Sequence, residues 1–454
     1  MSPTNPLPLH GYLRADGRKG IRNVVVVAYL VECAHHVARE ITLNFRHQQG
    51  DVEVHLVGFP GCYPNEYAER MMTAITTHPN VGAALLISLG CESMNKRKLE
   101  QAIEASGRPV HTLTIQQKGG TRSTIREGTE WVEWALAELA QQERVPMAMN
   151  ELIVGTICGG SDGTSGITAN PAVGHAFDLL IAQDARCIFE ETGELIGCEF
   201  HMKRRAVTPE LGEAIVECVN KATRYYSIMG HGSFAPGNAD GGLSTIEEKS
   251  LGAYAKSGAS PINGIVKPGD VPPQGGLYLS LPVSTCLYLS LPVSTCLYLS
   301  LPVSTCLYLS LPVSTCLYLL DVVPDGEPRF GFPNISDNAE IVELIACGAH
   351  LILFTTGRGS VVGSAISPVI KVCANPDTYR QLGEDMDVDA GRILEGRGTL
   401  QEVGQEIFDA VRDVANGAPS KSEELGHREF ILTYKAFEPL GPSCLPLQPL
   451  ARAA

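Results

Sequence analysis

The feature that most constrains the fold of this chain is a regular alternation of short apolar runs with stretches of helical length. Each run is rich in Val, Ile, Leu and Ala, as expected for a strand that is buried on both faces of a parallel sheet. The predicted strands of the first part cover residues 24–30, 52–58, 83–89 and 110–115. The helices predicted between and after them cover residues 34–45, 66–77 and 122–142. This pattern predicts a domain built from β–α–β units.

A second domain is predicted after a polar junction near residues 141–150. At 454 residues the chain is long enough to bury two hydrophobic cores. The later strands are predicted at residues 152–157, 187–190, 351–355 and 369–373, and a final helix at 400–414. We therefore expect two α/β domains with mainly parallel, Rossmann-like sheets, one spanning residues 1–145 and the other residues 146–454.

The charge and the first residues of the chain limit its partners and its location. The formal charge is −15 at pH 7, which opposes the attraction to phosphates on which nucleic-acid binding depends. The first ten residues lack a basic stretch followed by an apolar core, which an export signal needs. We therefore expect a cytoplasmic protein that binds neither nucleic acid nor a membrane.

A decapeptide repeat interrupts the second domain over residues 277–316. The sequence Leu-Tyr-Leu-Ser-Leu-Pro-Val-Ser-Thr-Cys occurs four times without a change, starting at Leu277, Leu287, Leu297 and Leu307. A proline in every copy rules out a continuous membrane helix. Removal of the four copies leaves a plausible strand at residues 317–321. We interpret the repeat as a tandem duplication or an assembly error and assign it no function.

Three cysteines each follow a predicted strand of the first domain. Cys62 lies 29 residues after Cys33, and Cys91 lies 29 residues after Cys62, about one β–α unit per step. Because parallel strands end at one edge of their sheet, we expect the three thiols at the same edge. There they would suit a soft or borderline metal ion. The alternative is that they are small residues in tight turns.

Two glycine-rich loops and one polar segment have the composition of a site for an acidic substrate. The loop at residues 158–166 lies between a predicted strand and a helix, where free backbone amides attract a carboxylate. An arginine after the strand at 351–355 suits two-pronged binding of a carboxylate. The substrate-binding candidates are Gly159, Gly160, Ser161, Asp162, Asn238, Thr356 and Arg358. A simple turn or an ordinary ion pair is the alternative for each.

Acidic residues gather after the strand predicted at residues 187–190, with His201 close behind them. Removal of water from a hydroxy acid needs a base for the proton beside the carboxylate, and an acid or a metal ion for the leaving hydroxyl. We interpret Glu191 or His201 as the base, and Lys249 as a cation that stabilises the enolate-like charge. A solvated acidic turn is the alternative.

Six short segments carry a family resemblance. They are Gly11-Tyr-Leu-Arg-Ala-Asp-Gly-Arg18, Gly20-Ile-Arg-Asn23, Leu89-Gly-Cys-Glu92, Gly119-Gly-Thr-Arg122, Cys158-Gly-Gly-Ser-Asp162 and Phe354-Thr-Thr-Gly-Arg-Gly359. Together they resemble the altronate/galactarate dehydratase family, from about Gly11 to Phe430 apart from the repeat. The resemblance implies a hydro-lyase that converts a sugar acid, an aldonate or an aldarate, into a 2-keto-3-deoxy acid. It also implies a divalent metal ion, iron(II) above all, and three cysteines would also suit an iron–sulfur cluster.

Departures from the family pattern keep two alternatives open. The small N-terminal domain of the dehydratases is not found before Gly11, which implies a separate small subunit. Gly58, four residues before Cys62, stands where the dehydratases often have histidine, and this leans toward the large subunit of sulfolactate sulfo-lyase, a related branch that expels sulfite. A non-catalytic subunit that binds a sugar acid is the second alternative. In each case we expect an oligomer with a small acidic ligand.

Overall fold

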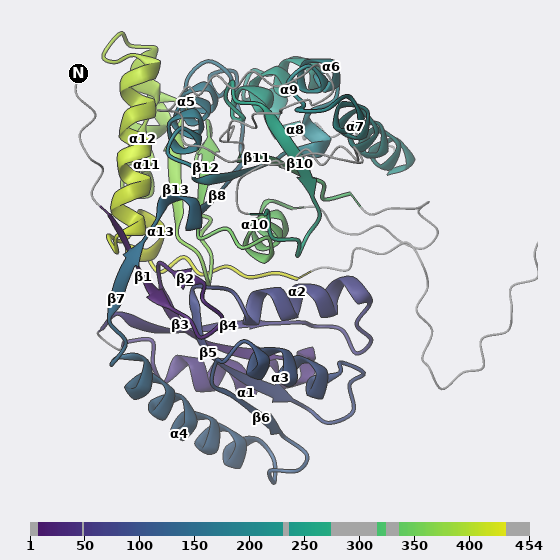
Figure 1. Cartoon of the computed structure of the whole chain (residues 1–454), viewed down its shortest axis with the longest axis vertical. Coiled ribbons are helices and arrows are strands. Elements are labelled where there is room, and N and C mark those ends of the chain that lie inside the picture. Colours follow the sequence, from purple (N-terminus) through teal and green to yellow (C-terminus); the bar gives the residue numbers. More distant parts are fainter. Residues whose placement is uncertain (1–7, 48–49, 230–235, 274–315, 324–335, 433–454) are drawn as a thin grey trace, which may run out of the picture.

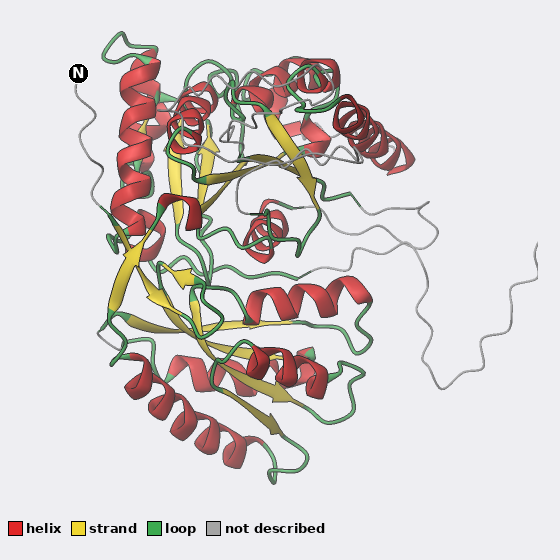
Figure 2. Cartoon of the chain, viewed as in Figure 1, coloured by secondary structure: helices red, strands yellow, loops and turns green. Residues whose placement is uncertain are grey.

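The computed structural model of the chain describes residues 8–47, 50–229, 236–273, 316–323 and 336–432. Within these residues the helices and strands form two α/β lobes, one above the other in Figure 1, each built around a parallel sheet. Helices lie on both sides of the strands (Figure 2). The predicted fold class, two α/β units with mainly parallel sheets, is confirmed.

The smaller parallel sheet lies in the lower lobe of Figure 1 and has the strand order β4-β3-β5-β6. Its strands are β3 (Asn23–Tyr29), β4 (Val52–Gly58), β5 (Val81–Ser88) and β6 (Val110–Thr114). All eight residues of β5 are buried, as expected for a central strand that is covered on both faces. Each of these strands overlaps a predicted one, so the hydrophobic pattern located the whole sheet.

Two pairs of helices cover the smaller sheet. They are α1 (Glu32–Leu43), α2 (Glu66–Thr76), α3 (Lys96–Ala105) and α4 (Thr121–Leu139). The apolar faces of α1 and α4 pack on one side, against residues such as Val25 and Leu85. Those of α2 and α3 pack on the other side, against residues such as Val26. Asn65 and Asn95 cap α2 and α3 by accepting a backbone N–H with their side chains.

The larger sheet in the upper lobe is also parallel and has the order β10-β11-β9-β8-β12-β13-β14. Its strands are β8 (Ile153–Cys158), β9 (Arg186–Glu190), β10 (Ile262–Val266), β11 (Leu317–Leu320), β12 (Leu351–Thr356), β13 (Val369–Cys373) and β14 (Val388–Asp389). From β8 the chain first adds strands on one side and later, from β12 on, on the other. Open α/β sheets bind ligands at such a reversal, at the carboxyl ends of the strands.

Helices flank the larger sheet on both faces. They are α5 (Ala169–Ile181), α6 (Glu199–Lys203), α7 (Pro209–Met229), α8 (Pro236–Asp240), α9 (Ile246–Ala255), α10 (Asp337–Ala346), α11 (Pro376–Leu382), α12 (Leu400–Ala415) and α13 (Lys421–Glu424). Short 3-10 turns add η1 (Met149–Glu151), η2 (Thr192–Glu194) and η3 (Gly391–Ile393). α5 and α12 share the apolar core on one face, and α10 covers the other. The side chain of Thr399 caps α12 in a capping box with Glu402.

A small antiparallel sheet beside the two lobes was not predicted from the sequence. It has the order β2-β1-β7 and consists of β1 (Leu9–Leu13), β2 (Lys19–Gly20) and β7 (Arg144–Met147). β7 joins the predicted end of the first domain to the start of the chain, since Leu9 lies opposite Met147. The boundary between residues 145 and 146 stays a prediction.

The two lobes share an apolar core and a buried polar network. The core extends from α2 of the first lobe to α10 and β12 of the second, and the Tyr67 hydroxyl of α2 donates to Glu343 of α10 at 2.6 Å. The Asn80 side chain accepts the N–H of Ile21 at 2.9 Å and donates to the His350 carbonyl at 3.0 Å. Asn80 and His350 are both buried, so the network fixes how the lobes meet.

The decapeptide repeat at residues 277–316 lies outside the described residues apart from its last residue, Cys316. The strand predicted directly after it is confirmed as β11, which pairs in parallel with β10 and β9. None of the helices in the described ranges is both long enough and apolar enough to cross a lipid bilayer.

Candidate functional site

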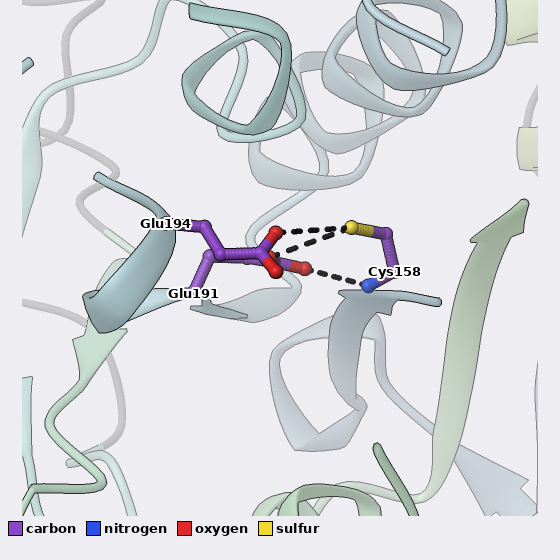
Figure 3. A group of neighbouring side chains, drawn as sticks. All are labelled: Cys158, Glu191 and Glu194. Carbon is purple, nitrogen blue, oxygen red and sulfur yellow. Dashed lines mark hydrogen bonds between the residues drawn. The ribbon is translucent and has the colours of Figure 1, made fainter. Parts of the chain in front are cut away.

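The carboxyl ends of β8 and β9 bring three ligand-type side chains together (Figure 3). The strands are parallel neighbours, so Cys158 at the end of β8 lies beside Glu191, which follows β9. The N–H of Cys158 donates to Oε1 of Glu191 at 2.6 Å. Its Sγ lies 3.4 Å from Oε2 of Glu191 and 3.4 Å from Oε2 of Glu194. We call these three residues the Cys158 cluster; their ligand atoms all lie within 4.8 Å of one another.

A tight turn after β9 sets the two carboxylates of the Cys158 cluster. Glu191 has a φ of 154°, a conformation that residues other than glycine rarely adopt. The hydroxyl of the next residue, Thr192, donates to the Leu320 carbonyl of β11 at 2.8 Å and holds the turn against the sheet. Unusual backbone of this kind persists where the surrounding structure enforces it, often at functional sites.

Two lysines from α9 and its C-cap contact the carboxylates of the cluster. The Lys249 ammonium group contacts Oε1 of Glu194, and that of Lys256 contacts Oε1 of Glu191. Both lysines are buried, Lys256 completely. They are seven residues apart, or about two helical turns, so both come from one face of the helix. Each carboxylate thus has one oxygen on a lysine and the other near Cys158 Sγ.

Burial and these charges shift the pKa values of the cluster. Burial raises the pKa of the Cys158 thiol well above its usual value, and Glu191 raises it further. Burial also raises the pKa of Glu191, with the help of the neighbouring Glu194. Burial alone would raise the pKa of Glu194 too, but Lys249 lowers it to about 2. The protein alone therefore holds a neutral thiol beside a charged Glu194–Lys249 pair.

The donors of the Cys158 cluster fit a borderline divalent metal ion. One sulfur and two carboxylate oxygens suit Fe²⁺ or Zn²⁺ better than Mg²⁺ or Ca²⁺, which prefer oxygen alone. The lysines hold the outer carboxylate oxygens and so orient the ligands from behind. A bound metal ion would also keep the Cys158 thiol deprotonated in spite of its burial.

Glycine loops at the ends of β8 and β12 form a second part of the site. These strands are parallel neighbours at the reversal of strand order. The N–H groups of Gly357 and Arg358 donate to the Gly160 carbonyl at 3.1 and 2.8 Å, and the Arg358 guanidinium contacts the Gly237 carbonyl. The buried Asn238 follows in α8. The structure therefore brings together three segments that the sequence proposed separately as substrate loops.

Asp162 of the first glycine loop serves the loop itself. Its Oδ1 accepts the N–H groups of Thr164 at 2.9 Å and Ser165 at 3.1 Å, and its Oδ2 accepts from Asn375 at 2.9 Å. A Cβ at Gly357 would lie 2.1 Å from Oδ1 of Asp162, so the loops approach as closely as they do only with glycine there. Asp162 thus fixes the loop, and its carboxylate is committed to that task.

A cavity of about 210 Å³ opens beside the Cys158 cluster. Cys158, Ser161 and Lys249 line it, together with residues of α5 and α9. The Ser161 hydroxyl lies 3.2 Å from Cys158 Sγ. The volume is below the roughly 300–1,000 Å³ of sites for drug-sized ligands, and so suits a small molecule that reaches both the thiol and the ammonium group.

Comparison with known proteins decides the family. Residues 149–289 and 313–437 match the family "D-galactarate/Altronate dehydratase, C-terminal", and residues 11–140 match "D-galactarate dehydratase/Altronate hydrolase, second domain". The chain belongs to the D-galactarate/altronate dehydratase family. The resemblance seen in the sequence is thereby confirmed over both lobes.

Relatives in the D-galactarate/altronate dehydratase family are named as lyases. The chain is 30% identical to (2R)-sulfolactate sulfo-lyase subunit beta of Chromohalobacter salexigens, over 93% of this chain and 96% of that one. It is 30% identical to galactarate dehydratase (L-threo-forming) of Escherichia coli, over 92% and 74%. It is 27% identical to altronate dehydratase of Bacillus subtilis, over 93% and 76%. At the coarse level that these names share, the chain is a lyase.

The cysteines predicted as metal ligands of this family member lie at one sheet edge but not at one point. Cys33, Cys62 and Cys91 are exposed in the loops and helix that follow β3, β4 and β5. Among the described residues, the Cys158 cluster is the one set of three metal-ligating side chains with all ligand atoms within 4.8 Å. The three predicted cysteines do not meet that spacing, and their metal-binding role stays a prediction. Gly58, at the end of β4, lies at the same edge. A Cβ at this position would be 2.3 Å from Cδ1 of Tyr29, so a larger residue would clash with the Tyr29 ring.

The two candidate bases lie in different surroundings. Glu191 belongs to the buried cluster, whereas His201 is exposed on α6 with its ring 6.0 Å from that of Tyr254. The described contacts of the Cys158 cluster do not include His201. Lys256 was not predicted at all, although its spacing of seven residues from Lys249 is the signal of a shared helix face.

Proposed function

We propose that the chain is a hydro-lyase that removes water from a sugar acid, an aldonate or an aldarate, and yields a 2-keto-3-deoxy acid. The observation that carries the proposal is the buried Cys158 cluster with its two lysines. Elimination of water requires a base and a group that helps the hydroxyl to leave, and the cluster offers candidates for both beside one cavity. Membership of the dehydratase family supports the same reaction.

In this proposal Glu191 takes the proton next to the substrate carboxylate. It lies at the cluster with Lys256 on its outer oxygen, and burial raises its pKa above the usual value, which makes its carboxylate a stronger base. Lys249, which lines the cavity, stabilises the negative charge that develops on the substrate as the proton leaves. His201 is the weaker candidate for the base because it is exposed and outside the cluster.

A metal ion would be held by Cys158 and Glu194, with Glu191 within reach, and would assist departure of the hydroxyl as a Lewis acid. We propose iron(II) as that ion, because sulfur and carboxylate ligands suit it. Glu194 is suited to hold a cation since Lys249 lowers its pKa to about 2, and the group is therefore ionised at neutral pH. An iron–sulfur cluster at the exposed cysteines of the first lobe is the lesser candidate.

The glycine loops are proposed to hold the carboxylate of the substrate. Gly159, Gly160 and Ser161 lie between Cys158 and the neighbouring loop that carries Thr356 and Arg358. The exposed guanidinium of Arg358 has donors to spare beyond its contact with the Gly237 carbonyl. Asn238 supports this segment from α8. Asp162 is proposed to act on the loop conformation, not on the substrate.

A second candidate function is that of a sulfo-lyase subunit, which would expel sulfite from sulfolactate. The observation that favours it is coverage, since the chain aligns with 96% of the sulfo-lyase subunit beta but with 74–76% of the dehydratases. That relative is named as a subunit, so this candidate includes a separate small subunit and an oligomer. The reaction at the cluster differs only in the leaving group.

The test is anaerobic turnover by the purified chain with iron(II), with and without a candidate small subunit. Galactarate, altronate and sulfolactate are offered separately, and 2-keto acid and sulfite are measured independently. Keto acid without sulfite supports the dehydratase. Sulfite supports the sulfo-lyase. Binding of these acids without any product, in the presence of metal and small subunit, would instead indicate a non-catalytic sugar-acid-binding subunit.

A further inference from the structure

The turn that carries the two carboxylates of the Cys158 cluster contacts α7 as well as the sheet. Its middle residue, Gly193, is buried in η2 between Glu191 and Glu194. A Cβ at Gly193 would lie 2.4 Å from Cε2 of Tyr226 and 2.7 Å from the hydroxyl oxygen of that residue. Side-chain atoms do not approach one another so closely. Glycine therefore allows the phenol end of Tyr226 to lie directly against the backbone of the turn.

Tyr226 is held in place by its own neighbours. It is half-buried on α7 and packs against the apolar core that the two lobes share. The ring of Tyr225 meets its ring edge-on, with centroids 5.4 Å apart and planes at 84°. Burial raises the pKa of the Tyr226 hydroxyl, and the carboxylates of Glu340 and Glu194 raise it further. Tyr226 thus stays neutral and adds no charge to the cluster that it supports.

The turn needs such support because its backbone is in a rare conformation. The φ of 154° at Glu191 persists only where the surrounding structure enforces it. The hydroxyl of Thr192 ties the turn to β11, and the ring of Tyr226 lies against the next residue, Gly193. The N–H of Glu194 donates to the Glu191 carbonyl at 2.7 Å and closes the turn. A shift of Gly193 would therefore move both carboxylates.

We propose that Tyr226 is a positioning residue, whose ring holds the turn after β9 in the shape that directs Glu191 and Glu194 at Sγ of Cys158. This inference rests on the proposed function, because it concerns the metal ligands of that site. In this role Tyr226 touches neither substrate nor metal ion and acts through the two carboxylates. Loss of a group that orients metal ligands lowers metal affinity by about 10–100-fold. Loss of the ring should therefore appear in metal binding by the folded protein.

The experiment compares the iron(II) affinity of the wild type, Tyr226→Ala and Tyr226→Phe, measured anaerobically by competition with a chromogenic chelator. Tyr226→Phe keeps the ring on Gly193 and loses only the hydroxyl. Tyr67→Ala is the matched control, since Tyr67 is also half-buried against the shared core but donates to Glu343 at the junction of the lobes. The melting temperature of each metal-free protein records the stability that each variant loses.

Gly193→Ala tests the same contact from the other side, because the added Cβ drives the ring and the turn apart. In the double variant with Tyr226→Ala, the space left by the ring accepts this Cβ. The loss of iron(II) affinity in the double variant should therefore be smaller than the sum of the two single losses. Should Tyr226→Ala fail to fold, Gly193→Ala decides alone.

We expect Tyr226→Ala and Gly193→Ala to bind iron(II) about tenfold more weakly or worse, and Tyr226→Phe and Tyr67→Ala to stay within about twofold of the wild type. Equal weakening in Tyr67→Ala, or wild-type affinity in Tyr226→Ala or Gly193→Ala, would overturn the inference, as would a wild type that binds no iron(II). Product from galactarate, altronate and sulfolactate is assayed separately. Turnover without these differences in affinity leaves the lyase proposal intact, and the differences without turnover leave this inference intact.

Discussion

The two parallel sheets both present cysteines at their carboxyl edges, yet the two edges differ in chemistry. At the smaller sheet the three cysteines are exposed. At the larger sheet Cys158 is buried between two carboxylates, and α9 covers the edge with two lysines. Parallel topology is common to both edges, so it cannot be what makes a site. The difference lies in burial and in the opposite charges that make burial of carboxylates tolerable.

This comparison predicts where a lost charge is costly. Lys256→Met should leave the buried Glu191 without its counter-charge and destabilise the protein by about 3–5 kcal/mol. Lys96→Met at the smaller sheet, where the half-buried ammonium contacts the hydroxyls of Ser88 and Thr114 at 3.0 Å, should cost at most about 1 kcal/mol. Urea denaturation measures both.

A double variant sharpens this result. Glu191→Gln added to Lys256→Met removes the stranded charge and should recover part of the lost stability, because the buried pair is then replaced on both sides. Equal losses for Lys256→Met and Lys96→Met, or no recovery in the double variant, would show that burial does not separate the two edges.

The next prediction concerns metal binding at each edge. Cys158→Ser should lower iron(II) retained after anaerobic reconstitution and gel filtration, with affinity and turnover falling by about 100-fold, since a hydroxyl is a poor substitute for a thiolate ligand. Cys62→Ser is the matched control at the exposed edge and should change neither. Elemental analysis reports the metal directly. Metal loss in Cys62→Ser with retention in Cys158→Ser would reverse the assignment of the two edges.

The sequence predicted the sheets better than it predicted the site. β4 and β13 have the bounds predicted from their apolar runs, because strands buried on both faces carry an unmistakable pattern. The sheet of β1, β2 and β7 escaped prediction because it joins residues more than a hundred positions apart through strands as short as two residues. Local pattern carries no signal for such a pairing.

The site shows the same limit at the level of side chains. Equal spacing correctly placed three cysteines at one edge, but the turn at each strand end decides where a side chain points, and spacing does not encode it. Lys249 and Glu191 were expected to act together, and Lys249 does contact Glu194, the neighbour of Glu191 in the Cys158 cluster. His201 was grouped with them because it is near in sequence, whereas α6 carries it to the surface. The signal that could have revealed Lys256 is its position seven residues after Lys249, on the same face of α9, since two acidic residues of the turn after β9 needed two cations.

Burial should also appear in the pH dependence of stability. Burial lowers the pKa of His350, at the junction of the lobes, to about 4, against about 6.5 in an unfolded chain. Between these values the unfolded chain holds more protons, so stability falls as the pH falls through 6.5 toward 4. His350 should account for about 2 kcal/mol lost between pH 7.5 and pH 5.

His350→Gln tests this assignment because it removes the titrating group while keeping a side chain that hydrogen-bonds. Its stability, whatever its value at pH 7.5, should fall less steeply toward pH 5 than that of the wild type. Denaturation curves at four or five pH values give the slopes. Parallel slopes for the two proteins would mean that His350 does not carry the acid sensitivity, and the buried His78, whose pKa is lowered in the same way, would be the next candidate.

The smallest effect is expected from chemical modification of the exposed edge. Iodoacetamide should label Cys33, Cys62 and Cys91 in the native protein and spare Cys158, because alkylation needs an accessible thiolate and burial raises the pKa of that thiol. Peptide mass spectrometry identifies the labelled sites, and stability and turnover should change little. The reaction is then repeated after the protein has been loaded with iron(II). Protection of the exposed cysteines would mean that they bind the metal ion. Unchanged labelling would support the conclusion that burial next to opposite charges separates the Cys158 cluster from the exposed cysteines of the smaller sheet.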